Sequence, residues 1–149
     1  MKITRENETE SSFQLLRSYV TKLNIDNSFI EYDYKKAGDR LIDVSYVLTN
    51  LDDIAELERK AGAVDLEVKI NCTVESRSVN IHLIIRGIFL TDLSMSAETF
   101  ENMMKINGCT ALYSVARGII SSTSAQLFSA GNIVLPMVNF IKFHERNQE

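Results

Sequence analysis

The sequence predicts an α+β domain, in which helices cover one face of an antiparallel sheet. Between residues 40 and 90, apolar residues recur at every second position, as they do in half-buried strands. After residue 92 they recur at every third or fourth position, as they do in amphipathic helices. Strands that precede helices, without alternating with them, are typical of the α+β class.

The chain is expected to form one domain, residues 1–149. A compact domain of 149 residues buries roughly 70% of the surface of its unfolded chain, which is enough for a core of its own. Apolar residues make up 45% of the sequence and charged residues 24%, which is ordinary for a globular protein. We expect residues 1–11 and 144–149 to be flexible tails.

The first apolar segment, residues 13–25, fits two structures. A helix would align Phe13, Leu16, Val20 and Leu23 on one face, whereas a strand interrupted at Arg17 would align Phe13, Leu15, Tyr19 and Leu23. Periodicity alone leaves both alternatives open.

Three later segments alternate clearly between apolar and polar positions and predict strands, the last two joined by a short polar turn at residues 76–78. Their apolar faces are, in order, Ile42, Val44, Tyr46 and Leu48; Leu66, Val68, Ile70, Cys72 and Val74; and Val79, Ile81, Leu83, Ile85 and Phe89.

Two helices are expected after the strands. Ser96 is a good N-cap, and a short helix from there should stop near Asn107 and Gly108. A long amphipathic helix should follow and be closed by Gly131. Its apolar stripe comprises Leu112, Val115, Ala116, Ile119, Ile120, Thr123 and Leu127.

The second face of the long helix consists of small residues, and Arg117 is the only charged residue between Cys109 and Phe128. A solvated helix face ordinarily carries Lys and Glu, so this face is a candidate contact with the same helix of a second chain. The alternative is a neutral solvated face. The candidate interface residues are Ser114, Gly118, Ser121, Ser122 and Ala125.

Charge and composition exclude several classes of function. The net charge is -4, the sequence pI is about 5.3, and the 16 Lys and Arg are scattered, so nucleic-acid binding is not expected. No apolar run approaches the roughly 18 residues of a membrane span, so no membrane insertion is expected. The N-terminus lacks the features of a secretion signal, which predicts a cytoplasmic protein with Cys72 and Cys109 as reduced thiols.

The sequence does not predict an enzyme. His82 and His144 have no recognisable catalytic partner, and His82 is best interpreted as an outward residue of its strand. The cysteines and histidines form no close pair, so no metal site is expected. No glycine-rich nucleotide motif is present, and no cofactor is expected.

Four stretches together resemble the SecB family of protein-export chaperones. FQLLRSYVTK (13–22) is similar to the family's first strand, and RGIF (86–89) to the end of its fourth strand. CTALYSVAR (109–117) resembles the opening of the family's long helix, and LPMVNF (135–140) resembles its P-V-N-F element. This order and spacing span residues 13–140.

The resemblance implies a strand at residues 13–25, and therefore a four-stranded antiparallel sheet followed by a short and a long helix on one face. It implies a homotetramer, a dimer of dimers with the long helices between the sheets. It also implies an ATP-independent holdase that binds unfolded polypeptides in apolar grooves and in many bacteria delivers them to the motor SecA.

The sequence departs from the family pattern at several positions. Thr110 and Ser114 stand where the family has prolines, which removes two helix breakers. The family's acidic SecA-facing positions fall near Leu23 and His82, so carboxylates expected at a SecA contact are missing. A chaperone dedicated to one client, such as an antitoxin, is therefore an alternative.

The resemblance implies a client groove between the segment at residues 132–143 and the crossover at residues 28–40. Its candidate residues, each of which could instead belong to the core, are Phe29, Tyr32, Tyr34, Val134, Leu135, Val138 and Phe140. A function of a different class, a carrier that encloses a hydrophobic small molecule, is the rival hypothesis.

Overall fold

A computed structural model describes residues 11–28, 39–74, 76–127 and 132–146. The elements are β1 (Gln14–Asn27), β2 (Asp39–Asn50), the 3-10 turn η2 (Ala55–Leu57), β3 (Arg59–Val74), β4 (Arg77–Asp92), α1 (Ala97–Met103), the π-helical turn η3 (Met104–Gly108), α2 (Cys109–Leu127) and α3 (Phe140–Arg146). The predicted α+β architecture, with four strands followed by helices, is confirmed.

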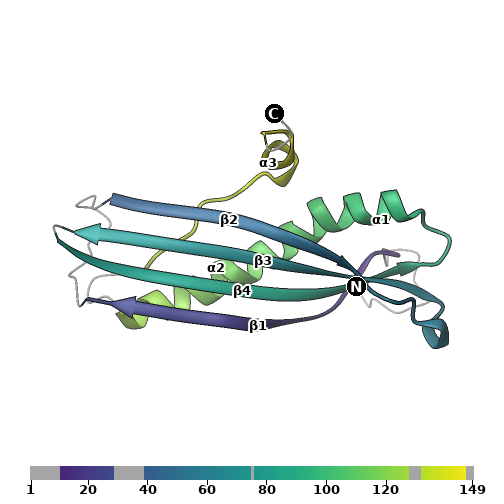
Figure 1. The fold of residues 1–149 in the computed structure, drawn as a ribbon, viewed down its shortest axis with the longest axis horizontal. Coiled ribbons are helices and arrows are strands. Elements are labelled where there is room, and N and C mark those ends of the chain that lie inside the picture. The colour runs from purple at the N-terminus through teal and green to yellow at the C-terminus, as the bar shows by residue number, and fades with distance from the viewer. Residues whose placement is uncertain (1–10, 29–38, 75, 128–131, 147–149) are drawn as a thin grey trace, which may run out of the picture.

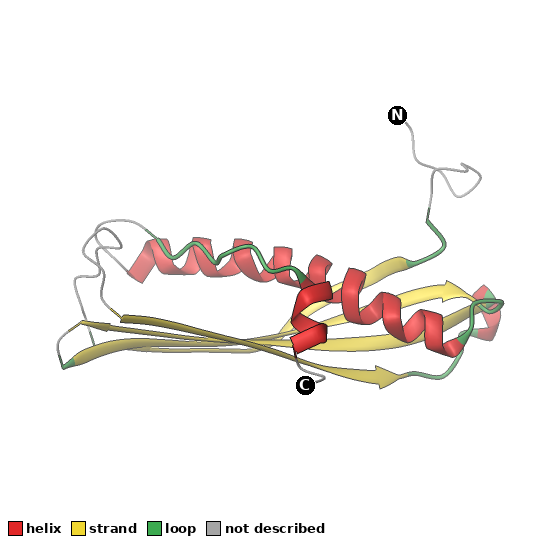
Figure 2. Cartoon of the chain, turned by 90° about the horizontal axis from the view of Figure 1, so that it is seen from above, coloured by secondary structure: helices red, strands yellow, loops and turns green. Residues whose placement is uncertain are grey.

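The four strands form one antiparallel sheet in the order β1-β4-β3-β2 (Figure 1). β2, β3 and β4 follow one another as hairpins, whereas β1 pairs with β4 across the whole length of the chain between them. The long helix lies against one face of the sheet, called here the helix side (Figure 2). None of the described elements covers the opposite face, called here the open face.

The core lies between the helix side of the sheet and α2. The apolar faces predicted for β3 and β4 are buried there, and the face predicted for β2 is half-buried. The side chain of Val74 lies outside the described residues. From α2, Leu112, Ala116 and Ile120 close the core from above. Each large aliphatic side chain that is fully buried contributes about 1.5–3 kcal/mol, so this layer is the main source of stability.

β1 is a strand, as the resemblance implied, but it contains two irregularities. Its register with β4 shifts between Leu15 and Arg17 and again between Val20 and Lys22. Each bulge adds a residue to one strand and so moves the following side chains to the other face. The helix-side residues Leu15, Val20 and Leu23 therefore do not follow a period of two, and they are 38–43% exposed because α2 packs mainly on β3 and β4.

The helices begin as predicted and end differently. Ser96 is the N-cap of α1, and its Oγ accepts a hydrogen bond of 3.1 Å from the backbone N–H of Thr99. The predicted stop near Asn107 and Gly108 is wrong, because α1 continues through η3 into α2 without a break. Gly108 serves close packing instead, since a Cβ there would lie 3.2 Å from Cζ of Phe89. α2 ends at Leu127, and Gly131 lies outside the described residues.

Candidate functional site

The segment at residues 132–146, called here the C-terminal segment, is bound along α2 and then forms α3. Its first part is extended and runs antiparallel to α2 (Figure 2). The last part, α3, lies beyond β2 in the view of Figure 1 and contacts that strand through Tyr46. The apolar stretch before the end of the chain is thus part of the folded domain.

Side chains of α2 hold the extended part in place. The backbone N–H of Ile133 donates to Oγ of Ser124 at 2.7 Å. Arg117 donates through Nε to the carbonyl of Leu135 at 3.0 Å, and the hydroxyl of Tyr113 donates to the carbonyl of Pro136 at 2.5 Å. Buried backbone groups need such partners because no neighbouring strand supplies them. The α2 residues involved are four and seven positions apart, which is one and two helical turns, and they therefore form one stripe of the helix.

The bond to Ser124 gives a direct test of this arrangement. Ser124 is buried, so the change Ser124→Ala should leave the Ile133 N–H without a partner and lower the free energy of unfolding by about 1–2 kcal/mol. Urea denaturation measures the loss, and amide hydrogen exchange at Ile133 should become faster. Gln126→Ala, at an exposed position of the same helix outside the candidate interface, is the control and should change neither quantity. An unchanged Ser124→Ala variant would contradict the assignment.

Side chains of the extended part alternate between the core and the surface. Leu135 is 1% exposed and packs in the core, as does Ile133, whereas Val134 is 55% exposed and Met137 is 85% exposed. Of the residues predicted to line a groove, Val134 lies on the surface and Val138 is half-buried. The prediction does not hold for Leu135 and Phe140, because both side chains are core anchors. Phe29, Tyr32 and Tyr34 lie outside the described residues.

α3 is fixed by an aromatic cluster around His144. The Nε2 atom of His144 lies 2.7 Å from the carbonyl oxygen of Lys105, and Nδ1 lies 3.0 Å from the hydroxyl of Tyr46. Because a carbonyl only accepts, Nε2 carries a proton and donates to Lys105, which leaves Nδ1 to pair with the hydroxyl of Tyr46. Burial raises the pKa of Tyr46, which keeps this hydroxyl protonated. The predicted flexible tail therefore does not begin at residue 144.

A surface groove of about 350 Å³, called here the α3 groove, opens beside the C-terminal segment. Its apolar part is formed by Val138, the half-buried Phe143 and the highly exposed Met137. Lys142 and Arg146, one helical turn apart on α3, add two cations. Of these residues, sequence reasoning identified only Val138. In an extended, proline-containing segment, side chains alternate between buried and exposed positions. This alternation was the signal that could have separated Met137 from the core positions.

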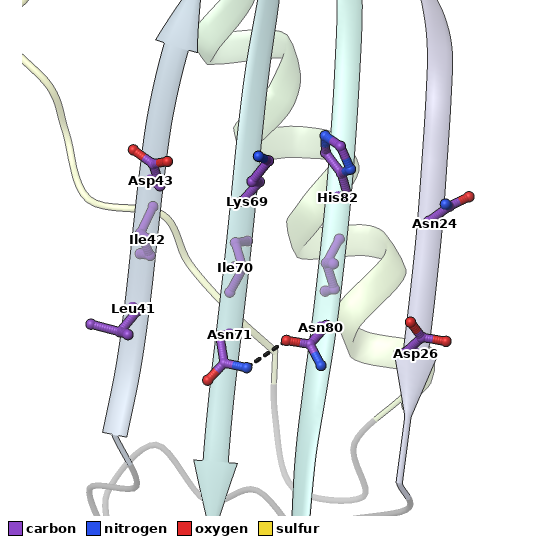
Figure 3. A pocket seen from close by; sticks show the side chains of 11 residues that line it. Asn24, Asp26, Leu41, Ile42, Asp43, Lys69, Ile70, Asn71, Asn80 and His82 are labelled. Carbon is purple, nitrogen blue, oxygen red and sulfur yellow. Dashed lines mark hydrogen bonds between the residues drawn. The ribbon is translucent and has the colours of Figure 1, made fainter.

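A larger trough of about 590 Å³ lies on the open face of the sheet (Figure 3). Two of its side chains form an amide pair, in which Nδ2 of Asn71 donates to Oδ1 of Asn80. His82 points to this face, as predicted, and donates to Glu67 at 2.9 Å. This hydrogen bond is the main cause of the lowered pKa of Glu67. Polar side chains of β3 and β4 on this face are therefore already bonded to one another.

The open face does not present the SecA-facing positions as a pair. His82 lies on the open face, whereas Leu23 pairs with Leu83 and lies on the helix side. The open face has its own carboxylates, but Asp65 receives two hydrogen bonds from Arg86, at 2.9 and 2.8 Å.

The small-residue face of α2 is largely uncovered in the single chain. Ser114, Gly118, Ser122 and Ala125 are exposed, and a Cβ at Gly118 would meet no atom within 4 Å. Ser121 differs from these residues, because it is half-buried and hydrogen-bonded to Asn132 of the C-terminal segment.

The described residues offer little for metal or thiol chemistry. They contain no group of three or more His, Cys, Asp and Glu that could hold a metal ion. Cys72 and Cys109 are both unpaired and buried, and burial raises the pKa of Cys109 to about 12. A thiol with such a pKa is a core residue and a poor nucleophile. Within the same part of the chain, no helix has the length and apolar character needed to cross a membrane.

Comparison with known proteins shows similarity at the level of structure. No protein-family model and no curated protein sequence matches the chain. Among solved structures it is similar to the SecB-like chaperone Rv1957 of Mycobacterium tuberculosis, in complex with a ChAD peptide from the antitoxin Rv1956 HigA1. The TM-score is 0.60 at 12% identity, over 85% of this chain and 91% of that chain. The chain has a SecB-like fold.

The chain is also similar in structure to a protein of unknown function from Streptococcus agalactiae. Its TM-score is 0.54 at 10% identity, over 84% of this chain and 97% of that chain. At these identities the likeness concerns the fold.

Proposed function

We propose that the chain is a cytoplasmic, ATP-independent holdase, which binds unfolded polypeptide clients on the apolar surface of its C-terminal segment. The observation that carries this proposal is the exposure of Met137, which lines the α3 groove, and of Val134 and Ile141 on the same C-terminal segment. These side chains belong to a segment that is anchored in the core at Leu135 and Phe140, so they stay on the surface in a fixed arrangement. Large apolar side chains that are held on the surface in this way are typical of interaction sites.

The physics of this surface suits a holdase. Burial of apolar client side chains gives about 25 cal/mol per Å², which is weak for each contact and tolerant of client sequence. Several such surfaces on one assembly would raise the overall affinity through effective concentration. Because the surface binds the unfolded client and not the native one, it shifts the folding equilibrium by mass action and needs no nucleotide.

The assembly we propose is a homo-oligomer, specifically a tetramer. Two features support it: β1 is an edge strand with exposed Leu15, Val20 and Leu23, and α2 exposes a face of small residues. An unpaired edge strand with apolar side chains is a site for pairing with another chain. The candidate contact residues on α2 are Ser114, Gly118, Ser122 and Ala125, with Ser121 at its margin.

The choice of client has one source of support. The M. tuberculosis chaperone with the same fold was solved with a peptide from an antitoxin. This favours a dedicated client, such as an antitoxin, as one form of the proposed function. Delivery to SecA is not part of the proposal, since Leu23 and His82 lie on opposite faces of the sheet.

The rival function, a carrier for a hydrophobic small molecule, has less support. The trough on the open face is open to the surface, and it is lined by seven Asn, Asp, Lys and His residues and by four Leu and Ile residues. A greasy ligand requires an apolar and largely enclosed pocket.

Size-exclusion chromatography with light scattering tests the proposal. The protein alone should have a mass near four chains, and it should co-elute with a chemically unfolded, slow-folding polypeptide. The same polypeptide in its native form is the control and should elute separately. A protein that ignores the unfolded polypeptide is not a holdase. If the protein is a monomer and still binds the unfolded polypeptide, the proposed tetramer is contradicted and the proposed holdase function is not.

A further inference from the structure

The charges of this protein are segregated along the chain. The sequence contains 20 Asp and Glu and has a net charge of -4, yet no carboxylate occurs between Lys105 and Glu145. Arg117 and Lys142 are the fixed cations within this stretch. α2, the extended part of the C-terminal segment and the first part of α3 lie within this stretch. These elements therefore carry a net charge opposite in sign to that of the whole chain.

The neighbouring strand β2 continues this pattern. Its helix-side positions are Arg40, four apolar or aromatic residues and Asn50, because alternate residues of a strand share a face, so none of them is a carboxylate. Burial raises the pKa of Tyr113. The positive charges of Arg117 and Arg40 oppose this rise, which means that both guanidinium groups interact electrostatically with Tyr113. On the open face, by contrast, the trough is flanked by Asp26 and Asp43 (Figure 3).

The two cations of the α3 groove are not neutralised by the described residues. Neither Lys142 nor Arg146 makes an ion pair with any side chain in the part of the chain that the structure describes. Glu145, the nearest carboxylate in the sequence, lines a different pocket together with Lys105 and His144. The α3 groove thus combines exposed apolar side chains with positive charges that are available to a partner.

We propose that the α3 groove recognises acidic–apolar client segments, in which a large apolar side chain enters the groove and flanking Asp or Glu residues contact Lys142 and Arg146. This inference rests on the proposed function and specifies the class of client for the same site. The overall negative charge does not oppose such contacts, because salt at physiological strength screens exposed charges beyond about 8 Å. The preference of the α3 groove for one client segment over another is therefore set by the charges that lie next to the bound segment.

Three fluorescent peptides test the inference by anisotropy. They share the same Leu, Phe and Val residues, separated by Glu in one peptide, by Gln in the second and by Lys in the third. With the full-length protein, the Glu peptide should bind about three- to tenfold more tightly than the Gln peptide, as expected for two exposed ion pairs, and the Lys peptide should bind least. A rise in salt concentration should reduce the difference between the Glu and Gln peptides.

A pair of variants assigns the preference to the groove. Lys142→Gln with Arg146→Gln should remove the advantage of the Glu peptide over the Gln peptide. The control, Lys22→Gln with Lys69→Gln, removes the same number of charges from the open face. This variant should still bind the Glu peptide more tightly than the Gln peptide.

The outcomes separate the two proposals. If no peptide binds, and unfolded polypeptide does not co-elute, the proposed function fails and the inference fails with it. Equal binding of all three peptides would leave the holdase in place and overturn the acidic preference. Tighter binding of the Lys peptide, or loss of the preference in the Lys22 and Lys69 control, would also overturn it.

Discussion

Replacement of Phe140 by alanine should lower the free energy of unfolding by about 3–5 kcal/mol, the usual loss when a buried Phe is truncated. Phe140 is 2% exposed, and its ring centroid lies 5.8 Å from that of Tyr113 and 5.5 Å from that of Phe143. The cavity left by Phe140→Ala would sit under α3, where little backbone is available to collapse into it. Urea denaturation followed by circular dichroism measures the change.

The neighbouring residue provides a matched control for Phe140→Ala. Ile141 is 53% exposed, so Ile141→Ala should change the free energy of unfolding by less than about 1 kcal/mol. If the two variants are equally stable, the assignment of Phe140 to the core is wrong. Because Phe140 positions α3, Phe140→Ala should also weaken client binding at temperatures where the variant remains folded.

The change Gly87→Val should destabilise the fold by about 3 kcal/mol, at the upper end of the usual overpacking range. Gly87 lies on β4 under α2, and a Cβ there would be 2.7 Å from Cδ2 of Leu112 and 2.9 Å from Cε2 of Phe89. Both neighbours are buried, so they cannot move aside without disturbing the core. The branched side chain would therefore force α2 away from the sheet. The same urea titration measures the loss.

A valine placed at an exposed position of the sheet is the control for Gly87→Val. It shows how much of the change in stability comes from valine as such, without overpacking. Ser45 is exposed on β2, and Ser45→Val should change stability by no more than about 0.5 kcal/mol. A Gly87→Val variant as stable as Ser45→Val would mean that α2 does not approach β4 as closely as described.

The sequence predicted elements best where the period of the apolar pattern was uninterrupted. β3 and β4 have no register shift over their pairing, so every second residue from Leu66 to Cys72 faces the core. β1 was ambiguous for a physical reason. Its two bulges space the helix-side residues Leu15, Val20 and Leu23 unevenly, and such a spacing is close to that of a helix.

The break expected between the helices shows a second limit of local signals. Asn107 and Gly108 are ordinary stop residues, but in this fold Gly108 lies beneath the ring of Phe89, and the chain continues as a π-helical turn. Thr110, whose hydroxyl donates to the carbonyl of Ile106 at 2.6 Å, makes this continuation possible where a proline would not. Tertiary packing thus decided the outcome.

The candidate site lies on the segment at which the resemblance implied a client groove, residues 132–143, and its binding role stays a prediction. The apolar character of the segment did not separate the buried Leu135 and Phe140 from the exposed Met137. That separation depends on the hydrogen bonds with which α2 fixes the orientation of the segment. His144 shows the same limit, since its partners Tyr46 and Lys105 are distant in sequence.

The position of β1 beside β4 has a consequence for biosynthesis. β1 is made first, but β4, its partner in the sheet, is made only after β2 and β3. At about 5–20 residues per second, a ribosome needs seconds to reach β4, and β1 has no partner strand during that time. Contacts between segments so far apart in the chain also form slowly once both are present. Each growing copy of this protein therefore displays, for a time, an unpaired apolar strand of its own.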